Sequence, residues 1–243
     1  MFQLIRWSLV LTWCLVLAIP AQAFTPDDGE LAHRVRGTYG PLSSWEAEMT
    51  FPDYSGVSAH LWYARGKWRQ EWSGGAKAVG LSGNVSARCT ASEFPLSPLF
   101  IWMTPDPVAA WRSWGVDNAT SAFGFCGDSP CYMFGVEQSD STLPAVFLNN
   151  ESLAPLLVRY GSGSGLTTVD FADYKTMGGF DVPQEVGVTR DGRTLRARVR
   201  WIAVNRADAE ELYARDALDT APCADPPEPF AILRDLFRYP SAR

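Results

Sequence analysis

Histidine and cysteine are scarce in this chain of 243 residues, which contains 2 histidines and 5 cysteines. A hydrolase triad needs a histidine base beside its nucleophile, and a zinc site needs closely spaced cysteine pairs or histidine partners. His33 and His60 offer neither pattern. Phosphate loops and dinucleotide fingerprints are also missing from the sequence. We therefore expect no catalytic site, no metal and no cofactor, and a hydrolase that depends on His60 is the remaining enzymatic alternative.

An excess of positive charge is missing as well. The chain has 21 Lys and Arg residues against 27 Asp and Glu residues, which gives a net charge of −6 at pH 7. Non-specific binding of nucleic acids rests on the neutralisation of phosphates by basic side chains. The acidic balance therefore argues against a nucleic-acid partner.

The chain has one long apolar run, and it lies at the N-terminus. Residues 1–23 combine an early cation, Arg6, an apolar stretch over 7–19 and a small-x-small ending at Ala21-Gln22-Ala23. This layout is typical of a secretory signal peptide that is cleaved after Ala23. The stretch is shorter than the roughly 20 residues that a membrane helix needs. We expect an exported, periplasmic protein with no stable membrane span after cleavage, and a retained anchor is the alternative.

Four cysteines remain once residues 1–23 are removed: Cys89, Cys126, Cys131 and Cys223. An even number of cysteines in an oxidising compartment predicts two disulfides. Cys126 and Cys131 flank a short turn that their own bridge can close, which leaves Cys89 to pair with Cys223. The second bridge would attach the C-terminal tail to the body of the protein.

Alternating apolar and polar residues predict antiparallel strands over most of the chain. In 44–51, apolar residues alternate with polar ones that include Glu46, which is expected to face solvent. Residues 60–72 (HLWYARGKWRQEW) are expected to form an aromatic hairpin that turns at Gly66. A second hairpin is expected over 182–205, with an Asp191-Gly192 turn. Three arginines of its last strand point outward, as is common on exposed sheet faces: Arg196, Arg198 and Arg200.

The segment 93–120 interrupts this alternation with four prolines and a cluster of large apolar residues. Its residues 104–114 are expected to form a helix, with proline in the first turn and Gly115 after the last. The segment is either a plug that completes the core or a movable lid over an apolar cavity. We call it the inserted segment.

Three further helices are expected, over 26–38, 206–218 and 228–240. We divide the chain into a signal peptide (1–23), a half-barrel domain (24–218) that contains the inserted segment, and a proline-rich linker with a C-terminal helix (219–243). The C-terminal helix either docks on the body or offers its apolar face to a partner.

These elements predict a mainly β (α+β) fold: an incomplete antiparallel β-barrel that curls around a helical and irregular lid, with N- and C-terminal helices. The concave face of such a sheet is apolar and must be covered by protein or filled by a ligand, because exposed apolar surface costs roughly 25 cal/mol per Å². A binding protein for a hydrophobic molecule is therefore the favoured function.

The order of these features resembles the periplasmic lipoprotein-carrier superfamily, with the LolA/LolB-like fold, as a divergent member. The resemblance rests on SWEAEMTFP, SGVSAHLWYARGKWRQEW, the inserted segment and FADY…VPQEVGV…RVRWIAVN. It implies a cavity that receives lipid or lipoprotein acyl chains. It also implies that Arg65, in a Leu-Trp-x-x-Arg motif where Gly66 replaces the family's proline, is a latch that bonds the lid.

The residues expected to line such a cavity come from the lid and from the sheet. On the lid they are Phe94, Leu96, Leu99, Phe100, Trp102, Met103 and Trp111. On the sheet they are Trp45, Met49, Tyr63, Trp68 and Trp72. We expect a monomer. The alternative function is a non-catalytic envelope interaction or scaffold module that holds a protein partner through the C-terminal helix or the aromatic hairpin.

Overall fold

The computed structural model describes residues 28–161, 165–206, 209–218 and 223–240. The predicted signal peptide lies outside these residues, so the prediction of export is not tested by the structure. None of the helices within the described residues is long and apolar enough to cross a membrane.

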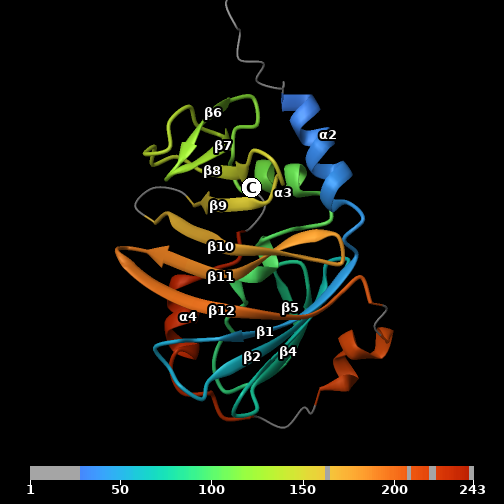
Figure 1. The fold of residues 1–243 in the computed structure, drawn as a ribbon. Coiled ribbons are helices and arrows are strands. Elements are labelled where there is room, and N and C mark those ends of the chain that lie inside the picture. Colours follow the sequence, from blue (N-terminus) through green and yellow to red (C-terminus); the bar gives the residue numbers. More distant parts are fainter. Residues whose placement is uncertain (1–27, 162–164, 207–208, 219–222, 241–243) are drawn as a thin grey trace, which may run out of the picture.

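The described residues form one antiparallel sheet of 12 strands. The strands are β1 (Ser44–Thr50), β2 (Ser58–Ala64), β3 (Lys67–Trp72), β4 (Lys77–Leu81), β5 (Asn84–Cys89), β6 (Ser121–Cys126), β7 (Ser129–Phe134), β8 (Ala145–Asn149), β9 (Pro155–Tyr160), β10 (Thr167–Met177), β11 (Phe180–Arg190) and β12 (Arg193–Val204). Strands that follow each other in sequence are neighbours in the sheet, except for β5 and β6, and β1 also pairs with β12. The two edges are therefore β5 and β6 (Figure 1).

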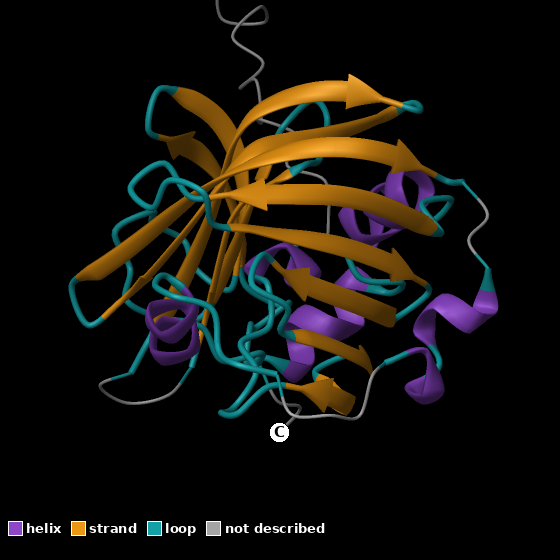
Figure 2. Ribbon diagram, turned by 90° about the horizontal axis from the view of Figure 1, so that it is seen from below, coloured by secondary structure: helices purple, strands orange, loops and turns teal. Residues whose placement is uncertain are grey.

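The inserted segment connects these two edges through the inside of the curled sheet. It contains the 3₁₀ helix η1 (Pro98–Ile101) and the helix α3 (Pro107–Ser113), which Asp106 caps by accepting a hydrogen bond from Ala109 N. Figure 2 shows the strands fanning over the helices rather than closing on themselves. The expected incomplete barrel around a helical and irregular segment is confirmed.

The N-terminal helix α2 (Asp28–Tyr39) and the C-terminal helix α4 (Phe230–Leu236) form close to their expected positions. The single helix expected over 206–218 is wrong. Two 3₁₀ turns, η2 (Glu210–Tyr213) and η3 (Arg215–Ala217), are separated by Ala214 in an extended conformation. The carbonyl of Leu212 accepts a hydrogen bond from Arg69 Nη1 at 3.0 Å, so an arginine outside the segment takes an acceptor that a continuous helix would use.

The polar face of β1 is only partly solvated, which corrects the expectation for Glu46. Glu46 is buried, with 7% of its surface exposed. Its carboxylate lies 2.9 Å from His60 Nε2 and accepts a hydrogen bond from Arg206 Nη2 at 2.5 Å. These two partners make the burial of a carboxylate tolerable.

The sheet bends where extra residues interrupt the pairing, at Glu46/Ala47, Val79/Gly80 and Phe147/Leu148. Gly80 sits at one of these points, directly opposite Trp68. The Trp68 indole lies against Gly80 and donates from Nε1 to Ser82 O at 2.8 Å. A Cβ atom on residue 80 would lie 2.3 Å from the Trp68 ring. The absence of a side chain at residue 80 thus lets Trp68 lie flat inside the curl.

We expect Gly80→Ala to destabilise the protein by about 1–3 kcal/mol, because both the Trp68 ring and the backbone carbonyl of Asn84, whose oxygen lies 2.2 Å from the added Cβ, must move. The measurement is the free energy of unfolding in urea. Gly37→Ala is the matched control: Gly37 lies in α2, and a Cβ there meets nothing within 4 Å. The control should be neutral or stabilising by up to about 1 kcal/mol, and equal losses in both variants would contradict this account.

Candidate ligand-binding site

The structure brings all 12 residues expected to line a cavity into one hydrophobic core. They are Trp45, Met49, Tyr63, Trp68, Trp72, Phe94, Leu96, Leu99, Phe100, Trp102, Met103 and Trp111, and none is more than 6% exposed. The sheet residues lie on the concave face, and the others reach it from the inserted segment. In this conformation the inserted segment therefore fills the half-barrel with its own side chains.

Phe100 is the centre of that packing. Its ring stacks on Trp45 with 5.7 Å between centroids and packs on Trp68 at 5.4 Å. Tyr63 stacks on Trp45 at 5.3 Å and lies 6.5 Å from Phe100. Three strand aromatics thus form a cup around one ring of the inserted segment.

Gln70 ties the inserted segment to the sheet. It is fully buried on the concave face. Its Nε2 donates to Pro95 O at 3.1 Å, and its Oε1 accepts from Ser97 N at 3.0 Å. The alternating pattern places Gln70 on the same face as Trp68 and Trp72 but did not predict this role. A polar residue between two inward-facing tryptophans was the available signal.

A second polar tie lies near the other end of η1. Trp102 Nε1 donates to Tyr174 Oη at 3.2 Å, and that hydroxyl donates to Pro155 O. Burial raises the pKa of the Tyr174 hydroxyl well above its usual value, so the hydroxyl stays protonated as a donor. The inserted segment is thus held to β3 and to β10 by neutral hydrogen bonds.

Arg65, expected as the lid latch, is not brought to the inserted segment. Arg65 is exposed in the β2–β3 turn, where its φ angle is +49°. It lines a pocket with Lys67, Arg206 and Glu210 instead. Within the described part of the chain, no hydrogen bond or ion pair joins its guanidinium to residues 93–120.

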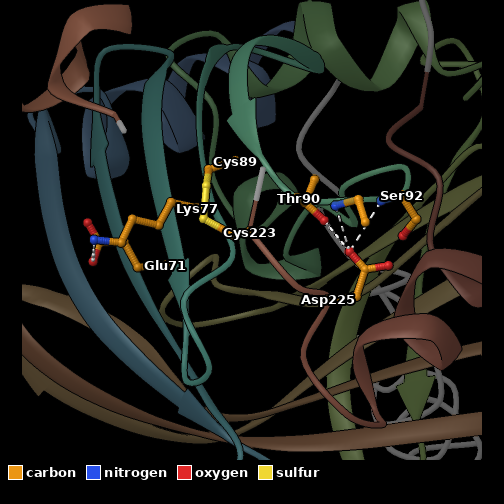
Figure 3. Close-up of a disulfide and its surroundings, with 8 residues drawn as sticks. Glu71, Lys77, Cys89, Thr90, Ser92, Cys223 and Asp225 are labelled. Atoms are coloured by element: carbon orange, nitrogen blue, oxygen red, sulfur yellow. Dashed lines mark hydrogen bonds and ion pairs between the residues drawn. A yellow bond between two sulfur atoms is a disulfide. The ribbon is translucent and has the colours of Figure 1, made fainter. Parts of the chain in front are cut away.

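The C-terminal tail holds the inserted segment from outside. Cys223 is bonded to Cys89 at the end of β5, and Cys126 to Cys131 within the β6–β7 hairpin, as expected. Figure 3 shows the Asp225 carboxylate facing Thr90 and Ser92, just beyond the first disulfide. Its Oδ1 accepts hydrogen bonds from Thr90 Oγ1 at 2.5 Å, Ala91 N at 3.0 Å and Ser92 N at 3.2 Å.

Helix α4 then docks on the body with its apolar face. Phe230 packs edge-on against Trp72 at 5.2 Å and Phe94 at 5.7 Å. Arg234 Nη1 donates to Ser92 Oγ at 3.0 Å. The apolar faces of α4 and of the aromatic hairpin are both buried here, so neither is presented to a protein partner in this conformation.

A pocket of about 440 Å³ opens where the inserted segment, the β4–β5 turn and the tail meet. We call it the mouth pocket; its lining includes Asn84, Thr104, Ala110, Trp114 and Tyr239. Trp114 and Tyr239 pack edge-on at 6.3 Å. The Thr104 hydroxyl is buried with no hydrogen-bond partner among the described residues. The volume and the mixture of aromatic and polar groups are ordinary for a ligand site.

Two indole N–H groups of the concave face also lack acceptors among the described residues: Nε1 of Trp45 and Nε1 of Trp72. Each buried donor left without an acceptor costs about 1–3 kcal/mol. The aromatic interior therefore contains two N–H donors, on Trp45 and Trp72, that an acceptor on a ligand could bond.

His60 lies on the opposite face of the sheet, where its ring stacks on Trp62 with 3.9 Å between centroids. Its side chain is hydrogen-bonded to the carboxylate of Glu46. No hydroxyl or thiol among the described residues is hydrogen-bonded to the His60 ring.

No protein-family model matches this chain, and no curated protein matches it. Solved structures do. A LolA superfamily protein from Nitrosomonas europaea is 11% identical, with a TM-score of 0.48 over 80% of this chain and 100% of that chain. A domain named for outer-membrane lipoprotein sorting, from Vibrio parahaemolyticus, is 12% identical, with a TM-score of 0.44 over 77% and 96%. A DUF1329 family protein from Desulfovibrio piger is 12% identical, with a TM-score of 0.43 over 79% and 98%.

Hydrogen bonds from the Ser92 and Thr90 side chains, and from the N–H groups of Ser92 and Ala91, lower the pKa of Asp225 to about 2. A carboxyl whose pKa is depressed in the folded state stabilises it above the unfolded value near 4, and the gain is lost as pH falls toward 2. Asp225→Asn should therefore lower the melting temperature at pH 6, but not at pH 2. The loss should be at most about 1 kcal/mol, since the group is exposed.

Asp128→Asn, at an exposed carboxylate in the β6–β7 turn, is the control for the change of charge. Thermal melts of the two variants and the wild type from pH 2 to pH 6 make the comparison. A difference between Asp225→Asn and the wild type that does not depend on pH would contradict the role of the carboxylate.

Proposed function

We propose that this chain is an exported cell-envelope protein that binds acyl chains of a lipid or a lipoprotein on the concave face of the half-barrel. The observation that supports this most is the pair of unpartnered indole N–H groups, on Trp45 and Trp72. Both belong to an apolar, aromatic surface that is covered by the inserted segment rather than by a second sheet. An ester or amide carbonyl on an acyl chain is the kind of acceptor that these donors need.

An acyl chain that replaces the inserted segment would exchange one set of apolar contacts for another. Phe100 and its neighbours fill the cup in the closed conformation. An acyl chain would replace those contacts at about 0.8 kcal/mol per buried CH₂ group. The polar ties that must break are few: the two hydrogen bonds of Gln70, the weak bond from Ser97 Oγ to Met49 Sδ and the bond from Trp102 to Tyr174. All of these groups can bond to water once exposed.

The mouth pocket provides an entry point. It lies between the inserted segment and the tail, so a chain that enters there separates the two. The Thr104 hydroxyl and the Trp114 and Tyr239 rings suit the junction between an apolar chain and its polar end group. In this proposal, residues 24–218 are the binding domain and 219–243 form a strap. Export through the 1–23 signal fits the presence of two disulfides.

A comparison of an ester with an ether tests the role of the indoles. Monopalmitoylglycerol and the hexadecyl ether of glycerol share a chain length and a head group, but only the ester has a carbonyl. The wild type should bind the ester about tenfold more tightly, the value of one buried hydrogen bond. Trp45→Phe or Trp72→Phe should move that ratio toward one.

Trp62→Phe, on the outer face of β2, is the matched control and should leave the ratio unchanged. Affinities are measured by displacement of a fluorescent fatty acid. The same affinity of the wild type for ester and ether would refute the hydrogen bonds to the indoles. A lack of binding of either compound would refute acyl binding itself.

Removal of the Cys89–Cys223 disulfide should speed the uptake of the fluorescent fatty acid several-fold. The Cys89→Ala/Cys223→Ala protein lacks the covalent tie that holds the strap beside the inserted segment, at a stability cost of about 2–5 kcal/mol. The Cys126→Ala/Cys131→Ala protein is the control, because it loses the disulfide of the β6–β7 hairpin, which does not involve the strap. Uptake rates that rise equally in both proteins, at a temperature where both are folded, would show that general loosening is responsible.

A further inference from the structure

A pocket of about 430 Å³ lies beside the β2–β3 turn and the end of β12. We call it the cationic pocket, and its lining includes Arg65, Lys67, Arg206, Glu210, Ser43 and Tyr213. It shares no lining residue with the mouth pocket. Three cations face one carboxylate here, in a chain whose net charge is −6.

Two of the three cations of the cationic pocket have a carboxylate partner within ion-pair distance. Arg206 bonds to the buried Glu46, and Lys67 is ion-paired with Glu210. Among the described residues, Arg65 has no recorded hydrogen bond or ion pair from its guanidinium. Its charge still acts on Glu210: the hydrogen bond and the charge of Lys67, with a smaller contribution from Arg65, lower the pKa of that carboxyl. Glu210 is thus the local anion for two cations.

The backbone at Arg65 adds an independent observation. Arg65 and Gly66 have φ values of +49° and +89°, the two-residue turn that asparagine or aspartate followed by glycine normally makes. An arginine holds this left-handed conformation only at a conformational cost. Its N–H donates to Ser43 O at 3.0 Å, which fixes the turn beside the pocket.

We propose that the cationic pocket binds a phosphate group, with Arg65 and Lys67 as the principal donors and Arg206 at its rim. Arginine presents its N–H groups in a fork that matches two phosphate oxygens. The Glu210 carboxylate lies where a phosphate oxygen would be held, so the ligand displaces it from Lys67. Glu210 is the first residue of η2 and belongs to no strand, so its displacement breaks no strand pairing.

The shared chemistry is a phosphate mono- or diester, which can belong to a lipid head group or to a soluble molecule. This site does not depend on acyl binding, because no residue of the concave face takes part in it. A protein that fails to bind any acyl chain could still bind phosphate here, and the two proposals can therefore fail separately.

The test is calorimetric titration of the full mature chain with inorganic phosphate, at low and at physiological ionic strength. Arg65→Asn removes the charge and keeps a residue that the turn prefers. It should weaken phosphate binding about tenfold, the value of a lost charge-assisted hydrogen bond. Lys67→Gln should do the same. Glu210→Gln should strengthen binding several-fold, because the competing carboxylate is gone.

Arg198→Ala is the control for net charge, since Arg198 is exposed elsewhere on β12. It should leave phosphate affinity unchanged. Co-sedimentation with vesicles of equimolar phosphatidylcholine and phosphatidylglycerol, against phosphatidylcholine alone, identifies the source. Sedimentation with the anionic vesicles that phosphate reverses indicates a lipid head group, and phosphate binding without sedimentation indicates a soluble ligand.

Two results would overturn the proposal. One is the absence of binding to both inorganic phosphate and the anionic vesicles. The other is binding that Arg65→Asn and Arg198→Ala reduce equally, which would show a general effect of charge rather than a site.

Discussion

An antiparallel sheet that curls without closing must bury its concave face against something other than itself. Here the curl comes from the pairing of β1 with β12 and from the bulges along the sheet, so that β5 and β6 are left as edges. The chain between those edges passes through the inside and fills it. Phe100 in its cup of Trp45, Tyr63 and Trp68 is the core contact, and the other elements of the interior pack around it.

The closed conformation depends on neutral hydrogen bonds inside and on covalent and charged contacts outside. Gln70 and Tyr174 hold the inserted segment from the sheet, while the disulfide to Cys223 and the Asp225 carboxylate hold its start from the tail. None of these contacts is a strand-pairing hydrogen bond of the sheet. The inserted segment is thus held from the sheet on the inside and from the tail on the outside.

The strands and the Cys126–Cys131 disulfide could be predicted because alternation and close cysteine spacing are local signals, and the Cys89–Cys223 disulfide then followed as the remaining pair. The inserted segment could be recognised because four prolines and a run of apolar residues break that alternation. Glu46 shows where the pattern fails: its polar side chain obeys the alternation, but partners from β2 and from beyond β12 bury it. The segment 206–218 fails for a similar reason, since Arg69 takes a helix acceptor from a distance.

The residues of the candidate site could be predicted from the sequence, but whether the inserted segment fills the interior or leaves a cavity could not. A list of inward-facing aromatics does not tell whether they line a cavity or fill it, since that depends on how the inserted segment packs. Nor could the sequence reveal the unpartnered indoles or the tie at Gln70, which need three-dimensional neighbours. Arg65 was singled out by a resemblance, but the turn geometry directs it to the cationic pocket, away from the inserted segment.

The central claim is that the interior which the inserted segment fills is also the place of an acyl chain. The most direct measurement is native mass spectrometry of the mature protein, prepared gently from the exporting host, followed by lipid extraction. The account predicts an added mass that is released as an acyl-bearing lipid. A bare protein mass that stays unchanged after incubation with lipids would contradict the account and leave the inserted segment as permanent core.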